Sequence, residues 1–159
     1  MSLSIRAAAP SDAALIRQLV AELAEYEELA HEALATEADF AGALFGPSPK
    51  AFAEIAELDG RPIGFSLWFY TFSTFVGRHG VYLEDLYVRP EARGRGAGRA
   101  LMASLARRCV EEGLGRMEWA VLDWNAPAIA VYDRVGSAPL QDWTVRRLTG
   151  EALRALAAG

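Results

Sequence analysis

The alternation of apolar and polar residues along the chain predicts a series of short strands and helices. Runs rich in β-branched and aromatic residues are typical of strands, and they lie at residues 3–6, 51–58, 62–72, 82–88 and 117–122. Asp59-Gly60, between the second and third runs, is a strong signal for a hairpin turn. The pattern therefore predicts a sheet that contains at least one antiparallel pair.

Apolar residues that recur every three or four positions predict helices between these strands. Pro10-Ser11-Asp12 is a helix start, and Thr36-Glu37-Ala38-Asp39 resembles a capping box for a second helix that Gly46-Pro47 ends. The third helix carries an apolar stripe of Leu101, Met102, Leu105 and Cys109.

The last third of the chain predicts two more helices and a second hairpin. One helix is expected from about Ala126 to Arg134, and Gly136 ends it. After it we expect a hairpin around residues 139–142, a strand over residues 143–148 and a terminal amphipathic helix. This order of elements predicts a single α/β domain over residues 1–159.

Composition narrows the class of protein. With 159 residues, of which 52% are hydrophobic, the chain is long enough for one buried core. A net charge of −5 disfavours binding to nucleic acid or to an anionic membrane. Cys109 lies on an apolar stripe, so we expect a buried structural thiol, and His31 and His79 lack metal-ligand spacing. Without a signal peptide or a long apolar run, the sequence predicts a cytoplasmic protein. The lack of metal-ligand spacing predicts that it binds no metal.

A glycine-rich turn joins the strand over residues 82–88 to the third helix. Arg93-Gly94-Arg95-Gly96-Ala97-Gly98 opens directly onto the helix, and Arg99 follows. Unpaired N–H groups and the positive end of the helix dipole converge there, and glycine lets a ligand approach the backbone. We therefore expect a phosphate or pyrophosphate site, although neither the dinucleotide fingerprint nor the P-loop sequence is present. The alternative is a glycine-rich turn with solvated arginines.

Two spaced motifs point to a family. Arg93-x-x-Gly96-x-Gly98 resembles the acetyl-CoA pyrophosphate loop of the GNAT superfamily of N-acetyltransferases, and Asn125-x-x-Ala128-x-x-x-Tyr132-x-x-x-Gly136 is similar to the signature after its fifth strand. With Tyr26-Glu27 and Tyr82-Leu83-Glu84-Asp85, they resemble the spermidine/spermine (diamine) N-acetyltransferases and their thialysine-acetylating relatives. The resemblance, from the first strand to Gly136, implies a GNAT fold with a mixed, mostly antiparallel central sheet flanked by helices.

The resemblance also implies the residues of the site. It assigns the cofactor acetyl-CoA to Leu86, Tyr87, Val88, Arg93, Gly94, Arg95, Gly96, Ala97, Gly98, Arg99, Asn125 and Tyr132. It assigns the amine substrate to Tyr26, Glu27, Glu84, Asp85 and Asp142. A homodimer is implied as well.

The chemistry of amine acetylation explains these residue types. An alkylammonium has a pKa of about 10, so a base must remove its proton before the amine attacks a thioester. Glu84, acting directly or through water, is the predicted base, and the resemblance gives Tyr132 the role of acid toward the departing thiolate. The alternative for Tyr132 is a core tyrosine that packs its helix. A backbone N–H between Leu86 and Val88 is expected to stabilise the thioester oxygen.

Glu84 and Asp85 are adjacent, so on a regular strand their side chains point to opposite faces of the sheet. Both can serve one cationic substrate only if a bulge re-aims one of them or a partner subunit completes the site. Glu84 is therefore the preferred contact to the amine.

The sequence predicts an acetyl-CoA-dependent enzyme that acetylates a primary amine of a small cationic molecule. Two alternatives stay open. One is an acetyltransferase that acts on a protein or peptide amine, and the other is a regulatory module that binds acyl-CoA without turnover.

Overall fold

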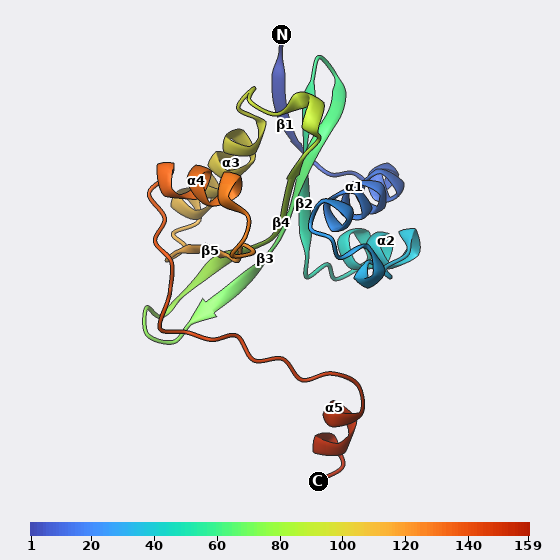
Figure 1. Ribbon diagram of the computed structural model, residues 1–159, viewed down its shortest axis with the longest axis vertical. Helices are drawn as coiled ribbons and strands as arrows, with labels where there is room; N and C mark the ends of the chain where they lie inside the picture. Colours follow the sequence, from blue (N-terminus) through green and yellow to red (C-terminus); the bar gives the residue numbers. More distant parts are fainter. The chain divides into compact units, whose positions relative to one another are not determined.

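A five-stranded sheet with its strands in sequence order forms the centre of the first part of the molecule (Figure 1). The computed structural model describes residues 1–159, which divide into the units Met1–Ala120 and Val121–Gly159. The strands are β1 (Leu3–Ala7), β2 (Phe52–Leu58), β3 (Arg61–Ser73), β4 (Arg78–Val88) and β5 (Met117–Trp119). All neighbours are antiparallel except β4 and β5, which are parallel. The predicted mixed, mostly antiparallel sheet is confirmed.

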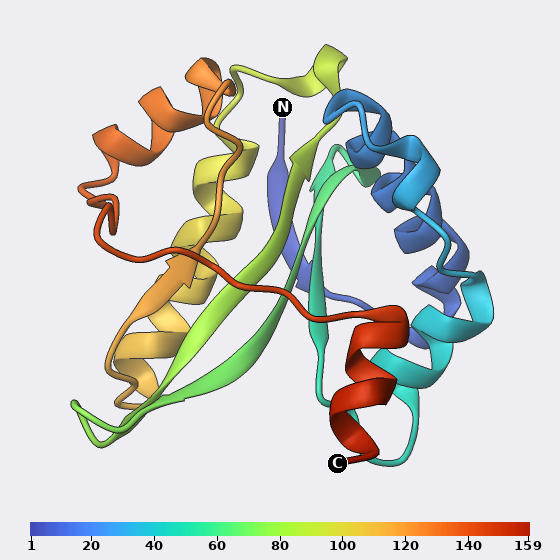
Figure 2. The same cartoon turned by 60° about the horizontal axis from the view of Figure 1, so that its bottom comes forward.

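Helices cover both faces of this sheet (Figures 1 and 2). On one face α1 (Ala13–Tyr26) and α2 (Glu37–Phe45) bury a core with Phe65, Leu67 and Tyr87. On the other face α3 (Ala97–Glu111) buries Leu101 against Ala56 and Ile63. Short 3₁₀ turns η1 (Pro10–Asp12), η2 (Ala30–Glu32) and η3 (Pro90–Ala92) complete this unit. The two cores fix β4 between α1 and α3.

Local sequence signals explain several of these boundaries. Asp59 and Gly60 have φ of 50° and 76°, the left-handed pair that a two-residue hairpin turn requires. At the start of α2, the hydroxyl of Thr36 accepts from the Asp39 N–H at 3.2 Å, and the Asp39 carboxylate accepts from the Thr36 N–H at 2.7 Å. The predicted hairpin and capping box are both confirmed, and Cys109 is buried as expected.

The prediction for the fifth strand is too long. We expected it over residues 117–122, but β5 ends at Trp119. Its partners in β4 are Val81, Tyr82 and Leu83, and the next residue of β4, Glu84, falls in a register shift. A strand cannot continue its ladder where its neighbour bends away, so β5 ends there.

The second unit holds α4 (Ala126–Arg134) and α5 (Gly150–Ala157), both as predicted. The predicted hairpin around residues 139–142 and the strand over residues 143–148 are wrong, because only a turn at residues 141–142 is present. Trp143 and Val145 are 76% and 88% exposed, so side-chain packing does not stabilise a strand there. β-propensity alone, without a paired neighbour, does not hold a strand. No helix of either unit has the length and apolar character needed to cross a membrane.

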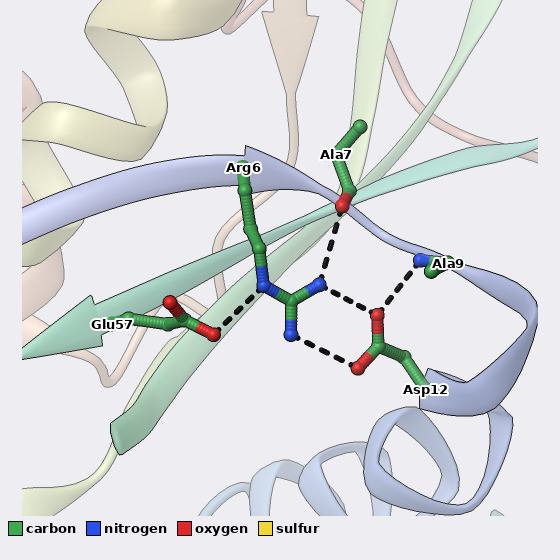
Figure 3. Close-up of polar contacts among 5 residues, drawn as sticks. All are labelled: Arg6, Ala7, Ala9, Asp12 and Glu57. Atoms are coloured by element: carbon green, nitrogen blue, oxygen red, sulfur yellow. Dashed lines mark hydrogen bonds and ion pairs between the residues drawn. The ribbon is translucent and has the colours of Figure 1, made fainter. Parts of the chain in front are cut away.

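One arginine joins the start of α1 to two strands (Figure 3). The guanidinium of Arg6 donates to both oxygens of Asp12 at 2.7 and 3.0 Å and, through Nε, to Glu57 at 2.7 Å. Asp12 also accepts from the Ala9 N–H at 2.7 Å. The Arg6 guanidinium holds the pKa of Asp12 below its usual value. The geometry is bidentate, which only arginine provides.

We predict that Arg6→Lys lowers the free energy of unfolding by about 1–2 kcal/mol, because an ammonium cannot serve both carboxylates in this planar arrangement. Urea denaturation measures the change, with Arg17→Lys, an exposed site on α1, as the matched control. Equal stability of the two variants would contradict a structural role for the bidentate pair.

Candidate active site

A β-bulge in β4 lies at the two predicted acidic residues. Trp68 of β3 pairs with Leu83, and the preceding Leu67 pairs with Asp85, so Glu84 is the extra residue. Leu67 belongs to the core beneath α1, whereas Trp68 lies under the Arg108 guanidinium of α3, 4.9 Å from its ring centroid. Residues opposite each other in a ladder share a face. Asp85 therefore faces α1, and the bulge that the sequence analysis required is present.

Three carboxylates from two elements come together at this bulge. Burial and, to a smaller extent, the charges of Glu84 and Glu27 together raise the pKa of Asp85 to about 7. Burial also raises the pKa of Glu27, the residue that caps the C-terminus of α1. Glu84 itself is exposed, and Asp85 and Glu27 are half-buried. The structure thus brings the predicted substrate residues Glu27, Glu84 and Asp85 into one electrostatic cluster.

The end of α1 contradicts the usual preferences of a helix C-terminus. The Leu29 N–H bonds to the Ala24 carbonyl at 2.8 Å and the Glu28 N–H to the Glu25 carbonyl at 3.1 Å, which is a Schellman motif. Its left-handed position, usually glycine, is Glu28 with φ of 61°. Glu25, Glu27 and Glu28 also place negative charge at the negative end of the helix dipole, and the last turn holds no basic residue. Stability alone does not explain this acidic end.

The glycine-rich loop has the backbone that an anion site needs. Gly94 and Gly96 have φ of 76° and 86°, a region that other residues rarely adopt. Gly96 is the N-cap of α3 and offers no side-chain hydrogen bond to the first turn, so backbone N–H groups of that turn stay available to a ligand. Arg95 and Arg99 are exposed beside it, and Ala97 is buried as an anchor.

The edge of β4 beyond the bulge is open on the side of β5. Because β5 pairs only with residues Val81 to Leu83, Leu86, Tyr87 and Val88 have no strand partner on that side. Their other side pairs with β3. The use of a backbone N–H from this segment stays a prediction, and the side chain of Tyr87 is buried toward α1.

Two arginines that sequence reasoning did not connect with α1 lie close to it. The Arg93 guanidinium stacks 4.9 Å from the centroid of the Tyr26 ring, and its Nε donates to the Val88 carbonyl at 2.9 Å. Arg89 donates to both oxygens of Glu22 at 3.0 and 3.1 Å. The only sequence signal for these two contacts was that Glu22 and Tyr26 are four residues apart, which places both on the same side of α1.

A surface cavity of about 600 Å³ lies next to these arginines, lined by Gln18, Glu22, Glu25, Tyr26, Tyr87, Arg89, Pro90 and Glu91. It shares Tyr26 and Tyr87 with the predicted site but reaches neither the glycine loop nor Glu27. No group of three or more His, Cys, Asp or Glu side chains is arranged to hold a metal ion.

The remaining predicted residues lie in the unit Val121–Gly159. Asn125 is buried and caps α4, its side-chain oxygen accepting from the Ala128 N–H at 3.4 Å. Tyr132 lies on α4, and its carbonyl accepts from the Ser137 hydroxyl at 2.8 Å. Asp142 is exposed in the turn at residues 141–142. The helix cap gives Asn125 a structural role, and the functional roles of all three stay predictions.

Comparisons with known proteins point to one family. Residues 15–136 match the model of the Acetyltransferase (GNAT) family. A thialysine N-epsilon-acetyltransferase of Bos taurus is 37% identical over 96% of this chain and 96% of its own length. An L-ornithine N5-acetyltransferase of Arabidopsis thaliana is 31% identical over 96% of this chain and 86% of its own. Among solved structures, an integron cassette protein of V. cholerae superposes with a TM-score of 0.82 and 25% identity, over 100% of this chain and 99% of that one.

We predict that Glu28→Gly raises the free energy of unfolding by about 1 kcal/mol relative to Glu28→Ala, because both remove the charge but only glycine relieves the left-handed backbone. Thermal melts of the two variants measure the difference. If alanine is as stable as glycine there, the backbone at position 28 is not strained.

Proposed function

The chain belongs to the GNAT family of acetyltransferases and has the GNAT fold, and from that premise we propose which acceptor it uses. The acceptor is a primary amine of a small cationic molecule: a polyamine, a diamine or a thialysine-like amino acid. The acetyl donor is acetyl-CoA. The observation that carries the proposal is the cluster of Glu27, Glu84 and Asp85, held at the acidic end of α1 and at the bulge of β4.

A cationic acceptor explains why carboxylates are placed where they destabilise the protein. Like charges in one half-buried cluster repel, and the helix dipole at the end of α1 adds to the cost. An ammonium group bound among them would remove both penalties at once. The names of relatives support this class, because thialysine and L-ornithine both carry a primary amine on a charged amino acid.

The glycine-rich loop fits acetyl-CoA. Left-handed Gly94 and Gly96 lead into the first turn of α3, whose N–H groups suit a pyrophosphate. Arg93, Arg95 and Arg99 supply positive charge, and Leu86 to Val88 supply the open backbone edge. When bound, acetyl-CoA supplies a thioester whose carbonyl carbon accepts the amine.

Within the acidic cluster, Asp85 is better suited than Glu84 to take the proton of the amine. A base works best when its pKa lies near the operating pH, and the pKa of Asp85 is about 7. Asp85 is also the less exposed of the two, and it faces α1, whose C-terminus is capped by Glu27.

 Glu27 and Glu84 then remain to hold the charge of the substrate.

Two further roles complete the proposed chemistry. Tyr132 is the proposed acid toward the departing thiolate, because a phenol with a pKa of about 10 keeps its proton at neutral pH. A backbone N–H from the Leu86–Val88 edge is the proposed donor to the thioester oxygen. Asn125 and Asp142 are proposed to contact the cofactor and the amine, respectively.

The assembly and location of the protein belong to the same proposal. We expect one domain over residues 1–159, a cytoplasmic location and a homodimer, without nucleic-acid or membrane binding. Light scattering after gel filtration tests the dimer.

The experiment that tests the function is release of CoA from acetyl-CoA across a panel of acceptors. Polyamines, diamines, thialysine, ornithine and lysine should be acetylated faster than peptides with a free N-terminus or lysine side chain. The matched variant Tyr132→Phe should lower kcat on every amine by about 10²–10⁴-fold. Preference for peptides would favour the alternative of a protein or peptide acetyltransferase, and failure to release CoA with any amine would favour a regulatory module.

The loop predicts a separation of stability from cofactor affinity. Gly98 has no left-handed backbone, and an added Cβ would meet only Val88 Cγ2 at 3.9 Å, so Gly98→Ala should stabilise the protein by about 0.5–1 kcal/mol. The same methyl group should obstruct the pyrophosphate and weaken acetyl-CoA binding about tenfold, or about 1.4 kcal/mol. Calorimetry measures the affinity. Gly42→Ala, in α2 with open space for its Cβ, is the control that should stabilise without changing affinity.

Cation recognition predicts a difference between two kinds of amine. Glu27→Gln removes one charge and keeps the shape of the side chain, so it should raise KM for a diamine at least threefold more than KM for a monoamine of equal length. Added salt should weaken diamine use by the wild type more than by the variant. Glu32→Gln, an exposed site in η2, is the charge-matched control. Equal effects on both amines would contradict a role for Glu27 in binding the distant ammonium.

The carboxylate pair predicts a specific pH profile. A base is active when deprotonated, so kcat/KM should fall as the pH drops below about 7, the pKa of Asp85. Glu84→Gln removes a neighbouring negative charge that raises this pKa, so the acid limb should move to lower pH. Asp85→Asn should abolish the limb and lower kcat by about 10²-fold or more. If Glu84→Gln abolishes the limb instead, Glu84 is the base, as the sequence alone predicted.

A further inference from the structure

The cofactor loop and the end of α1 are in direct contact through one side chain. The Arg93 guanidinium lies 4.9 Å from the ring centroid of Tyr26 and 5.8 Å from that of Tyr87. Its Nε donates to the Val88 carbonyl at 2.9 Å, which fixes the arginine against the last residue of β4. Arg93 is also the first residue of the glycine-rich loop, and Tyr26 is the last residue of α1, next to Glu27.

A second contact holds the same face of α1 one turn earlier. Arg89 donates to both carboxylate oxygens of Glu22 and, through Nη1, to the Pro62 carbonyl at 3.2 Å. Glu22 and Tyr26 are four residues apart, so both lie on the side of α1 that meets the end of β4. The two contacts differ in kind, because the Arg93–Tyr26 contact is a stack at the loop itself, whereas the Arg89–Glu22 contact is an ion pair outside the loop.

The geometry of a guanidinium allows Arg93 to serve two partners together. Its flat face packs on an aromatic ring, while its N–H groups point outward in the plane and suit a phosphate. The tyrosine rings therefore restrict the arginine without using the donors that a pyrophosphate would take. A restricted arginine loses less side-chain entropy when the ligand binds.

We propose that Tyr26 is a positioning residue for acetyl-CoA: its ring holds Arg93, and through Arg93 the glycine-rich loop, against the end of α1 that carries Glu27. The inference rests on the proposed function, because it takes the loop as the pyrophosphate site. It gives Tyr26 a role toward the cofactor in addition to the role toward the amine that the sequence predicted. The cofactor site and the amine site thereby share one structural element.

The test is the affinity for acetyl-CoA alone, measured by calorimetry without any amine. Tyr26→Leu removes the ring and should weaken binding three- to tenfold, whereas Tyr26→Phe keeps the ring face and should stay within twofold of the wild type. Glu22→Gln loosens α1 at the other contact and should also stay within twofold. Thermal melts establish that each variant is folded at the temperature of the titration.

A double-mutant cycle separates this proposal from the cofactor assignment itself. Arg93→Met should weaken acetyl-CoA binding more than Tyr26→Leu does, and adding Tyr26→Leu to Arg93→Met should cause less than a further 1.5-fold loss. Unchanged affinity in Arg93→Met would contradict the assignment of the loop to the pyrophosphate. If Arg93→Met weakens binding but Tyr26→Leu matches Tyr26→Phe, or if the two losses are additive, the positioning role of Tyr26 is wrong. An equal loss in Glu22→Gln would likewise overturn it, because the docking of α1 and not the stack would then control affinity.

Discussion

The bulge at Glu84 is the constraint on which the rest of this site depends. One extra residue in β4 turns the strand so that Leu83 lies opposite Trp68 and Asp85 opposite Leu67. It also ends the ladder with β5 at Leu83, which leaves the edge from Leu86 to Val88 open. A regular strand would have paired that edge and placed the two carboxylates on opposite faces. A single insertion in the ladder therefore creates both the acidic cluster and the open backbone beside it.

The second constraint is the way in which α1 ends. A helix C-terminus favours a basic last turn and a glycine in the left-handed position, and α1 has neither. Glu27 is instead held half-buried near Asp85, where burial raises the pKa of both. Because the local preferences of a helix end do not explain these residues, the proposed binding of a cationic amine gives them a physical reason.

Much of this arrangement could be predicted from the sequence because its signals are local. Capping residues, the Asp59-Gly60 turn and helical stripes depend on neighbours a few positions apart, and these elements were confirmed. The strand over residues 143–148 was wrong, since its apolar side chains are exposed and propensity says nothing about a missing partner. The bulge was foreseen only as a condition, because register depends on the pairing of β3 with β4. Contacts between Arg93 and Tyr26, 67 residues apart, follow from the fold and leave no pattern in the sequence.

A raised carboxylate pKa does not by itself identify a catalytic group, and Glu54 shows why. Glu54 of β2 is 8% exposed, and burial raises its pKa as it does that of Asp85. Its neighbours, however, compensate the charge: the Ser104 hydroxyl donates at 3.0 Å, and Arg107 and Arg108 of α3 lower the pKa. Asp85 has the opposite surroundings, because the charges that act on it, from Glu84 and Glu27, are both negative and belong to two different elements. The fold itself supplies positive charge beside Glu54 but only negative charge beside the half-buried Asp85, and this difference is the physical reason for proposing that an amine binds at the end of α1.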